Sequence, residues 1–123
     1  MHIPARHTKC LFLKDEHERF YLVVLPAEKR LNMKVLRKKI NVRKLHFASP
    51  EELKNELHLT PGSVSLFGMI YAQTVNLIID KELWDANAVG FHPNINTSTI
   101  VVNHENLEKF YKSLRGKKEI LEL

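Results

Sequence analysis

The richest group of chemically useful side chains lies in residues 90–99. This stretch holds an imidazole at His92, carboxamides at Asn94 and Asn96, and several hydroxyls. Pro93 lacks a backbone donor and biases the residue before it toward an extended conformation, and asparagine favours turns. The sequence therefore predicts a polar bend that leads into an apolar strand. Loops on a rigid scaffold often carry binding groups; the alternative is an ordinary turn stabilised by its own capping side chains.

Residue types needed for covalent or metal chemistry are scarce. The single cysteine, Cys10, cannot form an internal disulfide and has no evident base partner, and there is no Gly-x-Ser-x-Gly elbow. The chain also lacks Cys-x-x-Cys and His-Glu-x-x-His motifs, and its seven histidines have no ligand spacing. We expect neither a metal nor a cofactor.

A second candidate surface is strongly basic. Residues 29–44 contain eight Lys or Arg side chains and no acidic one. Cations on successive helical turns repel one another, so a polyanion along that face would stabilise the helix. The alternative is a solvated surface. The candidate contacts to such a polyanion in this segment are Lys29, Arg30, Lys34, Arg37 and Lys38.

Length and composition predict one domain spanning residues 1–123. The formal charge of +5 and the pI of about 9.4 favour an acidic partner, of which a phosphate backbone is the commonest large example. The longest strongly apolar run, residues 21–25, is far shorter than the roughly 20 residues that cross a bilayer. No signal-peptide pattern opens the chain. We therefore expect a cytoplasmic protein without membrane association.

The elements that must position these groups are mixed. Strands are expected at residues 10–13, 20–25, 45–48, 63–70, 76–80, 99–102 and 119–123. Helices are expected after N-caps at Asn32, Ser49 and Asn103, and Ser49 with Glu52 forms a capping box. The predicted fold class is α+β (α/β mixed): a mostly antiparallel mixed sheet flanked by about three helices, with one face covered.

Several blocks, taken in order, resemble the YbaK/ProX family of aminoacyl-tRNA editing domains, trans-acting deacylases that also occur inserted in bacterial prolyl-tRNA synthetases. The resemblance covers nearly the whole chain and is closest to the branch called ProXp-ala or PrdX. It rests on residues 8–15, 21–27, 45–49, 61–65, 90–94 and 96–99. The resemblance implies hydrolysis of mischarged aminoacyl-tRNA, most directly alanyl-tRNA(Pro), with tRNA acceptor ends as partner.

The resemblance also implies site roles. A functional lysine falls at Lys9, a glycine whose carbonyl faces the substrate falls at Gly62 in preference to Gly68, and a histidine falls at His92. Lys9 would hold the terminal nucleotide or stabilise the developing oxyanion. The Gly62 carbonyl and the free ribose hydroxyl would orient an attacking water, while His92 would shape the pocket or move a proton. The expected pocket residues are Cys10, Leu66, Phe67, Gly68, Met69, Phe91, Asn94, Asn96 and Thr97.

Three departures from the branch keep alternatives open. Asparagine is usual where Cys10 stands, proline is usual where Leu66 stands, and relatives carry a helix and strand before the Lys9 strand. Another small aminoacyl group such as Cys or Ser on tRNA(Pro) is one alternative substrate. A non-catalytic module that binds the acceptor end is a second reading, and a structural role for the basic face is a third. A sheet edge exposed beside Lys9 would favour a homodimer.

Overall fold

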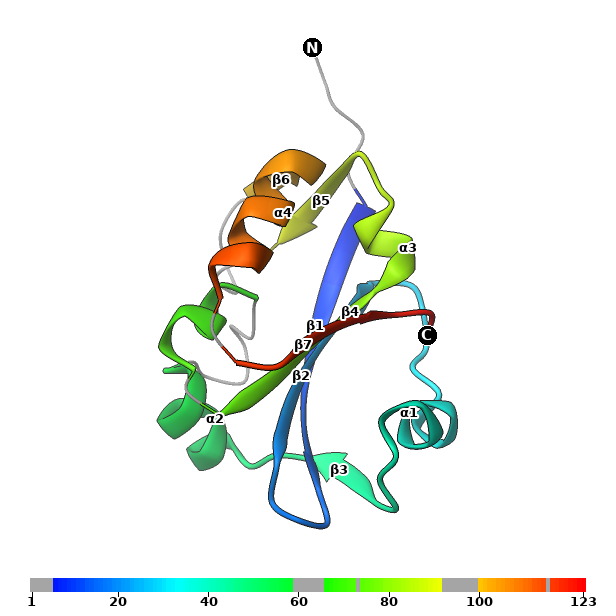
Figure 1. The fold of residues 1–123 in the computed structure, drawn as a ribbon, viewed down its shortest axis with the longest axis vertical. Helices are drawn as coiled ribbons and strands as arrows, with labels where there is room; N and C mark the ends of the chain where they lie inside the picture. Colours follow the sequence, from blue (N-terminus) through cyan, green and yellow to red (C-terminus); the bar gives the residue numbers. More distant parts are fainter. Residues whose placement is uncertain (1–5, 59–65, 73, 92–99, 115) are drawn as a thin grey trace.

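The computed structural model describes residues 6–58, 66–72, 74–91, 100–114 and 116–123 (Figure 1). Its centre is a seven-stranded mixed sheet in which the strands lie in the order β6-β5-β1-β2-β4-β7, with β3 paired to β1. The strands are β1 (Arg6–Asp15), β2 (Phe20–Pro26), β3 (Leu45–Phe47), β4 (Val75–Asp80), β5 (Ala88–Phe91), β6 (Ile100–Asn103) and β7 (Lys118–Leu121).

The predicted mixed α+β architecture is confirmed, with a larger parallel share than expected. The β1–β2, β1–β3 and β5–β6 pairs are antiparallel, whereas β1–β5, β2–β4 and β4–β7 are parallel. Parallel neighbours need crossover connections rather than tight turns. The crossovers carry the helices, which is why the chain alternates between sheet and helix.

The helices begin where their capping side chains predict. α1 (Met33–Ile40) starts after Asn32, whose side chain accepts a hydrogen bond from the Val35 amide. α2 (Pro50–Leu57) starts with the predicted capping box of Ser49 and Glu52. α4 (His104–Ser113) follows Asn103, whose side chain accepts from Asn106, and a short helix, α3 (Lys81–Trp84), follows β4.

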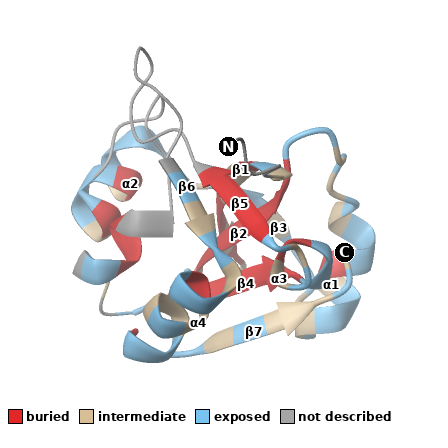
Figure 2. Ribbon diagram, turned by 90° about the horizontal axis from the view of Figure 1, so that it is seen from above, coloured by how far each residue is buried: buried red, intermediate tan, exposed pale blue. Residues whose placement is uncertain are grey.

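Both faces of the sheet carry a buried cluster, so the expectation of a single covered face is wrong. α1 lies on one face, where Leu36 packs with Leu13 and Val23. α2 and α4 lie on the other face (Figure 1), where Leu57 and Leu107 join Phe12, Leu22 and Val24 in one cluster. Consecutive residues of β1 and β2 therefore serve opposite cores, as the alternation of a strand requires. Figure 2 shows long buried runs in β2, β4 and β5.

One predicted strand is wrong. Within residues 63–70, the described part from Leu66 forms a 3-10 helix, η2 (Leu66–Tyr71). Met69 is buried at 3% exposure while Ile70 is 60% exposed. A short run in which neighbouring side chains alternate between core and solvent fits a strand and a 3-10 turn equally, so the sequence pattern could not separate them.

A buried carboxylate fixes the turn of the β1–β2 hairpin. Asp15 is 1% exposed and accepts hydrogen bonds from the backbone amides of His17 and Arg19, from the Arg19 guanidinium and from the Tyr21 hydroxyl. Burial alone raises the pKa of the Asp15 carboxyl, but these donors outweigh it and the pKa lies below its usual value. Burial and the hydrogen bond to Asp15 raise the pKa of Tyr21 to about 12.

The strand that carries Lys9 is interior to the sheet, so among the described residues the exposed edge expected beside it is limited to the interval between β5 and β3. β2 pairs along one side of β1, while β5 pairs with Arg6 and His7 and β3 with Leu13 to Asp15 on the other. On the side of β1 that faces away from β2, residues 8–11 lie between β5 and β3 and pair with no strand in the described part of the chain; we call this the open segment of β1. The predicted edge strand near the C-terminus is confirmed as β7, paired with β4.

Candidate functional site

Lys9 lies in the open segment of β1, opposite Leu25 of β2. Its residue is partly buried, and its ammonium has no hydrogen-bond or ion-pair partner among the described residues. Strand alternation puts Lys9 on the same face as Leu11 and Leu13, which pack toward α1. An ammonium that has no carboxylate partner in the described part of the chain is available to an anionic group.

Cys10 points to the opposite face of β1. It is partly buried and packs against the cluster that contains Phe12 and Met69. Two of the predicted pocket residues, Cys10 and Met69, are therefore brought into one cluster although they are 59 positions apart in the sequence. Gly68, next to Met69 in η2, is buried as well.

β5 is fastened to the start of the open segment by a side chain. The hydroxyl of Thr8, which is buried, donates a 2.8 Å hydrogen bond to the carbonyl oxygen of Gly90. This bond and the parallel pairing of His7 with Gly90 hold the end of β5 next to the Lys9 strand. Sequence reasoning missed Thr8, although its position directly before Lys9 in a matched block was a usable signal.

Several predicted site residues lie outside the described residues: Gly62, His92, Asn94, Asn96 and Thr97. For Leu66, Phe67 and Phe91 the backbone is described but not the side chain. The structure therefore brings Cys10 and Met69 together on one face of β1, with the Thr8–Gly90 link beside them, and places Lys9 on the opposite face of the same strand. The remaining assignments stay predictions.

The predicted basic surface divides into one compensated cation and seven uncompensated ones. Lys29 lies 2.9 Å from the buried Asp80 carboxylate and 3.3 Å from Glu82. Its pKa is raised, chiefly by the hydrogen bond to Asp80. The other seven cations form no ion pair within the described residues, so a polyanion could bind them without breaking one. They are Arg30, Lys34, Arg37, Lys38, Lys39, Arg43 and Lys44.

Lys29 belongs to an ion-pair network that joins three elements. Arg6 of β1 contacts Glu28 and Glu82 at 2.7 and 3.0 Å, and Lys29 connects Glu82 to Asp80 at the end of β4. The hydrogen bond to Glu82 contributes most to raising the Arg6 pKa. The network fixes the start of β1 against β4 and α3, which points to a structural role for Lys29 in addition to any contact with RNA.

Three cavities lined by described residues do not include Lys9. One of them, of about 110 Å³, is lined in part by Arg19, Tyr21, Asn76 and Lys118. It lies near the start of β2, whereas Leu25, which pairs with Lys9, lies near the end of that strand. Within the described ranges no three His, Cys, Asp or Glu side chains gather as metal ligands would. No described helix is long and apolar enough to cross a bilayer.

Comparison with known proteins identifies the family and the fold of this chain. Residues 3–110 match the model of the aminoacyl-tRNA editing domain. The prolyl-tRNA editing protein ProX of Acetoanaerobium sticklandii is 42% identical over 108 residues, which cover 85% of this chain and 66% of that protein. A prolyl-tRNA synthetase associated domain-containing protein of Danio rerio is 25% identical, covering 98% of this chain and 67% of the relative.

A solved structure described as a candidate trans-editing enzyme for prolyl-tRNA synthetase superposes with a TM-score of 0.74 at 17% identity, covering 95% of this chain and 69% of that one. The two chains therefore share a fold although few of their aligned residues are identical. This chain spans about two thirds of the length of these relatives. With the family model matched over most of its length, the chain belongs to the aminoacyl-tRNA editing-domain family, the YbaK/ProX group.

Proposed function

We propose that the chain hydrolyses the ester of mischarged aminoacyl-tRNA(Pro), with alanyl-tRNA(Pro) as the substrate, in the cytoplasm. The observation that carries the proposal is the position of Lys9. Lys9 is a partly buried residue in the open segment of β1 between β5 and β3, and its ammonium lacks a carboxylate partner in the described part of the chain. The likeness to ProX supports the same activity.

The proposed chemistry needs positioning more than a strong nucleophile. An aminoacyl ester is activated, so water is the attacking group, oriented by the Gly62 carbonyl and the free ribose hydroxyl. Lys9 binds the terminal nucleotide or the oxyanion, where a compact cation in a partly dry site is most effective. His92 shapes the pocket or moves a proton. Selectivity for alanine comes from steric exclusion of larger side chains, with Cys10 and Met69 among the pocket walls.

The experiment is single-turnover deacylation of a panel of tRNA(Pro) charged with alanine, cysteine, serine or proline. Wild type is expected to hydrolyse the alanyl ester fastest. Lys9→Ala is expected to lower that rate by about 10²- to 10³-fold, the usual loss when one oxyanion donor is removed. Lys109→Ala is the matched control, because Lys109 is an exposed cation on α4. Equal ester decay with and without wild-type protein would contradict the proposal.

The uncompensated cations of α1 favour a second function, a module that binds acceptor ends without cleaving the ester. In that case wild type and Lys9→Ala would bind tRNA alike and would both leave all four esters intact. Preference for the cysteinyl or seryl ester would instead retain the chemistry and change the substrate, as Cys10 and Leu66 in the pocket would allow.

A further inference from the structure

Phe47 is the most exposed large apolar side chain among the described residues. It is 63% exposed at the end of β3, whereas most aromatic rings in the described part pack against one of the two cores. An exposed ring of this size needs a reason, because its apolar surface is unfavourable in water.

The backbone that carries Phe47 is anchored. Leu13 and Phe47 are cross-strand partners, and the Ala48 amide donates a 3.0 Å hydrogen bond to the Phe12 carbonyl just beyond the strand. At the other end of β3, a carboxylate oxygen of Glu16 accepts from the amides of Arg43 and Lys44 at 2.6 and 3.1 Å. Phe47 is therefore presented by a fixed strand, not by a loose connection.

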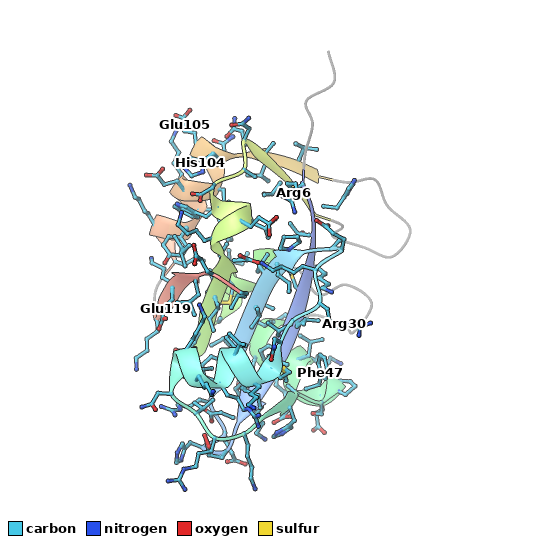
Figure 3. All side chains as sticks on the ribbon, turned by 90° about the vertical axis from the view of Figure 1, so that its right-hand side faces the viewer. Arg6, Arg30, Phe47, His104, Glu105 and Glu119 are labelled. Carbon is cyan, nitrogen blue, oxygen red and sulfur yellow. The ribbon has the colours of Figure 1, made fainter. Side chains whose placement is uncertain are left out.

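The ring stands on the same face of the sheet as Lys9. Leu45, two residues earlier in β3, packs toward α1, and alternation gives Phe47 the same side. Its partner Leu13 shares the β1 face that also bears Lys9. In Figure 3, which looks onto the molecule from the α1 side, Phe47 lies beyond the end of the helix at the margin of the sheet.

The surroundings of Phe47 along the chain are cationic. Arg43 and Lys44 are exposed and form no ion pair within the described ranges, and Lys44 directly precedes β3, three residues before Phe47. Of the two nearest carboxylates that follow, Glu52 is compensated by Lys14 at 2.6 Å, and Glu51 is exposed in the first turn of α2.

We propose that Phe47 is a stacking platform for an unpaired base at the acceptor end of the tRNA, with Arg43 and Lys44 binding the adjacent phosphates. An aromatic ring beside uncompensated cations is the combination that single-stranded nucleic acid requires, because the ring meets the base and the cations meet the backbone. The proposal rests on the proposed function, since it places the RNA strand on the face that bears Lys9.

The test is fluorescence anisotropy with 5′-labelled uncharged tRNA(Pro) and with the same RNA lacking its unpaired 3′ nucleotides. Phe47→Ala and Phe47→Leu are expected to bind the full RNA about five- to 150-fold more weakly than wild type, the usual cost of losing one stacked base. Phe47→Tyr and Phe47→Trp retain binding because they keep a π face. On the truncated RNA, wild type and Phe47→Ala bind equally.

Val101→Ala is the matched control, because Val101 is another exposed apolar side chain, 50% exposed on β6, and it should bind both RNAs as wild type does. Thermal unfolding of each variant shows whether the fold is kept. If Phe47→Leu binds the full RNA as well as Phe47→Tyr does, the proposal is overturned, because simple apolar contact then suffices. If wild type deacylates normally and Phe47→Ala binds like wild type, only the stacking site is wrong. If wild type neither binds nor deacylates the RNA, both proposals fail.

Discussion

Two charged regions of this molecule treat their cations in opposite ways. At the start of β1 and the end of β4, Arg6 and Lys29 contact Glu28, Glu82 and the buried Asp80. From residue 30 to residue 44, seven cations form no ion pair in the described structure. The first arrangement fixes strands to one another. The second leaves like charges close together on a short helix, which costs stability unless an anion is bound.

The contrast indicates which cations serve the fold and which are available to a ligand. A side chain that already has a carboxylate partner loses that interaction when it binds a phosphate, whereas an uncompensated one does not. The basic composition alone treats Lys29 and Lys34 as equivalent, but their surroundings separate them. Four experiments would break or sharpen this comparison.

The largest expected effect comes from the most buried compensated carboxylate. Asp15→Asn removes the charge that four donors surround and should lower the free energy of unfolding by about 2 to 4 kcal/mol in urea denaturation. Asp85→Asn is the control, since Asp85 pairs with Lys81 at an exposed position and should show no measurable change. Equal effects in the two variants would mean that burial does not decide how much a compensated carboxylate contributes to stability.

Tyr21→Phe should cost about 1.5 to 2 kcal/mol, because it removes one donor from a buried carboxylate. It should also change the acid limb of stability. The folded pKa of Asp15 is lowered, so its contribution is present above the unfolded value of about 3.9 and is lost as pH falls through the folded pKa. Without the Tyr21 hydroxyl, the folded pKa of Asp15 rises toward the unfolded value, so the loss of stability is smaller and is complete at a higher pH. Unfolding free energies measured from pH 2 to 6 would show this shift.

On the uncompensated side, the double variant Lys34→Glu, Lys38→Glu should weaken tRNA binding roughly ten-fold and reduce the salt dependence by about two phosphate contacts. Lys109→Glu with Lys112→Glu on α4 is the matched pair, because those lysines already contact Glu105 and Glu108. Anisotropy between 50 and 200 mM salt measures both slopes. If the salt dependence of tRNA affinity is unchanged in the α1 variant, Lys34 and Lys38 do not contact the tRNA and are simply solvated.

The smallest effect should come from giving α1 the acid it lacks. The first turn of α1 holds no acidic residue, and Val35, 38% exposed, is the third helical residue, four before Lys39. Val35→Glu can complete a capping box with Asn32 and pair with Lys39, a gain of about 0.5 kcal/mol in unfolding free energy. The same variant should bind tRNA more weakly. A lower unfolding free energy in this variant would show that repulsion between the cations of α1 does not destabilise the helix.

The two short-range signals, caps and periodicity, predicted most of the fold. Asn32, Ser49 and Asn103 cap the three longer helices as expected, because a cap depends on groups three residues apart. Strands with strong apolar runs, such as β2 and β4, were also found. The 3-10 helix η2 was missed because its burial pattern fits two local structures, and the second covered face was missed because alternation does not say what will lie on either side of a sheet.

The site was predictable only in part. Matched blocks pointed to Lys9 and Cys10, and the structure places them on opposite faces of one strand. Thr8, whose hydroxyl holds Gly90, and Phe47, exposed at the end of β3, were not singled out. The Thr8 hydrogen bond joins residues 82 positions apart, and the exposure of Phe47 depends on which elements lie next to it. No local sequence pattern encodes either feature.

The sequence by itself determined the family, the helix starts and the concentration of cations between residues 29 and 44, because each of these is written in residue types at fixed short spacing. The tertiary structure decided which of those cations are compensated: Lys29 meets Asp80 only because β4 ends beside β2. It also decided that Lys9 and Phe47 share a face of the sheet. The physical reason is that charge and apolar surface are properties of residues, whereas their neutralisation and burial are properties of neighbours.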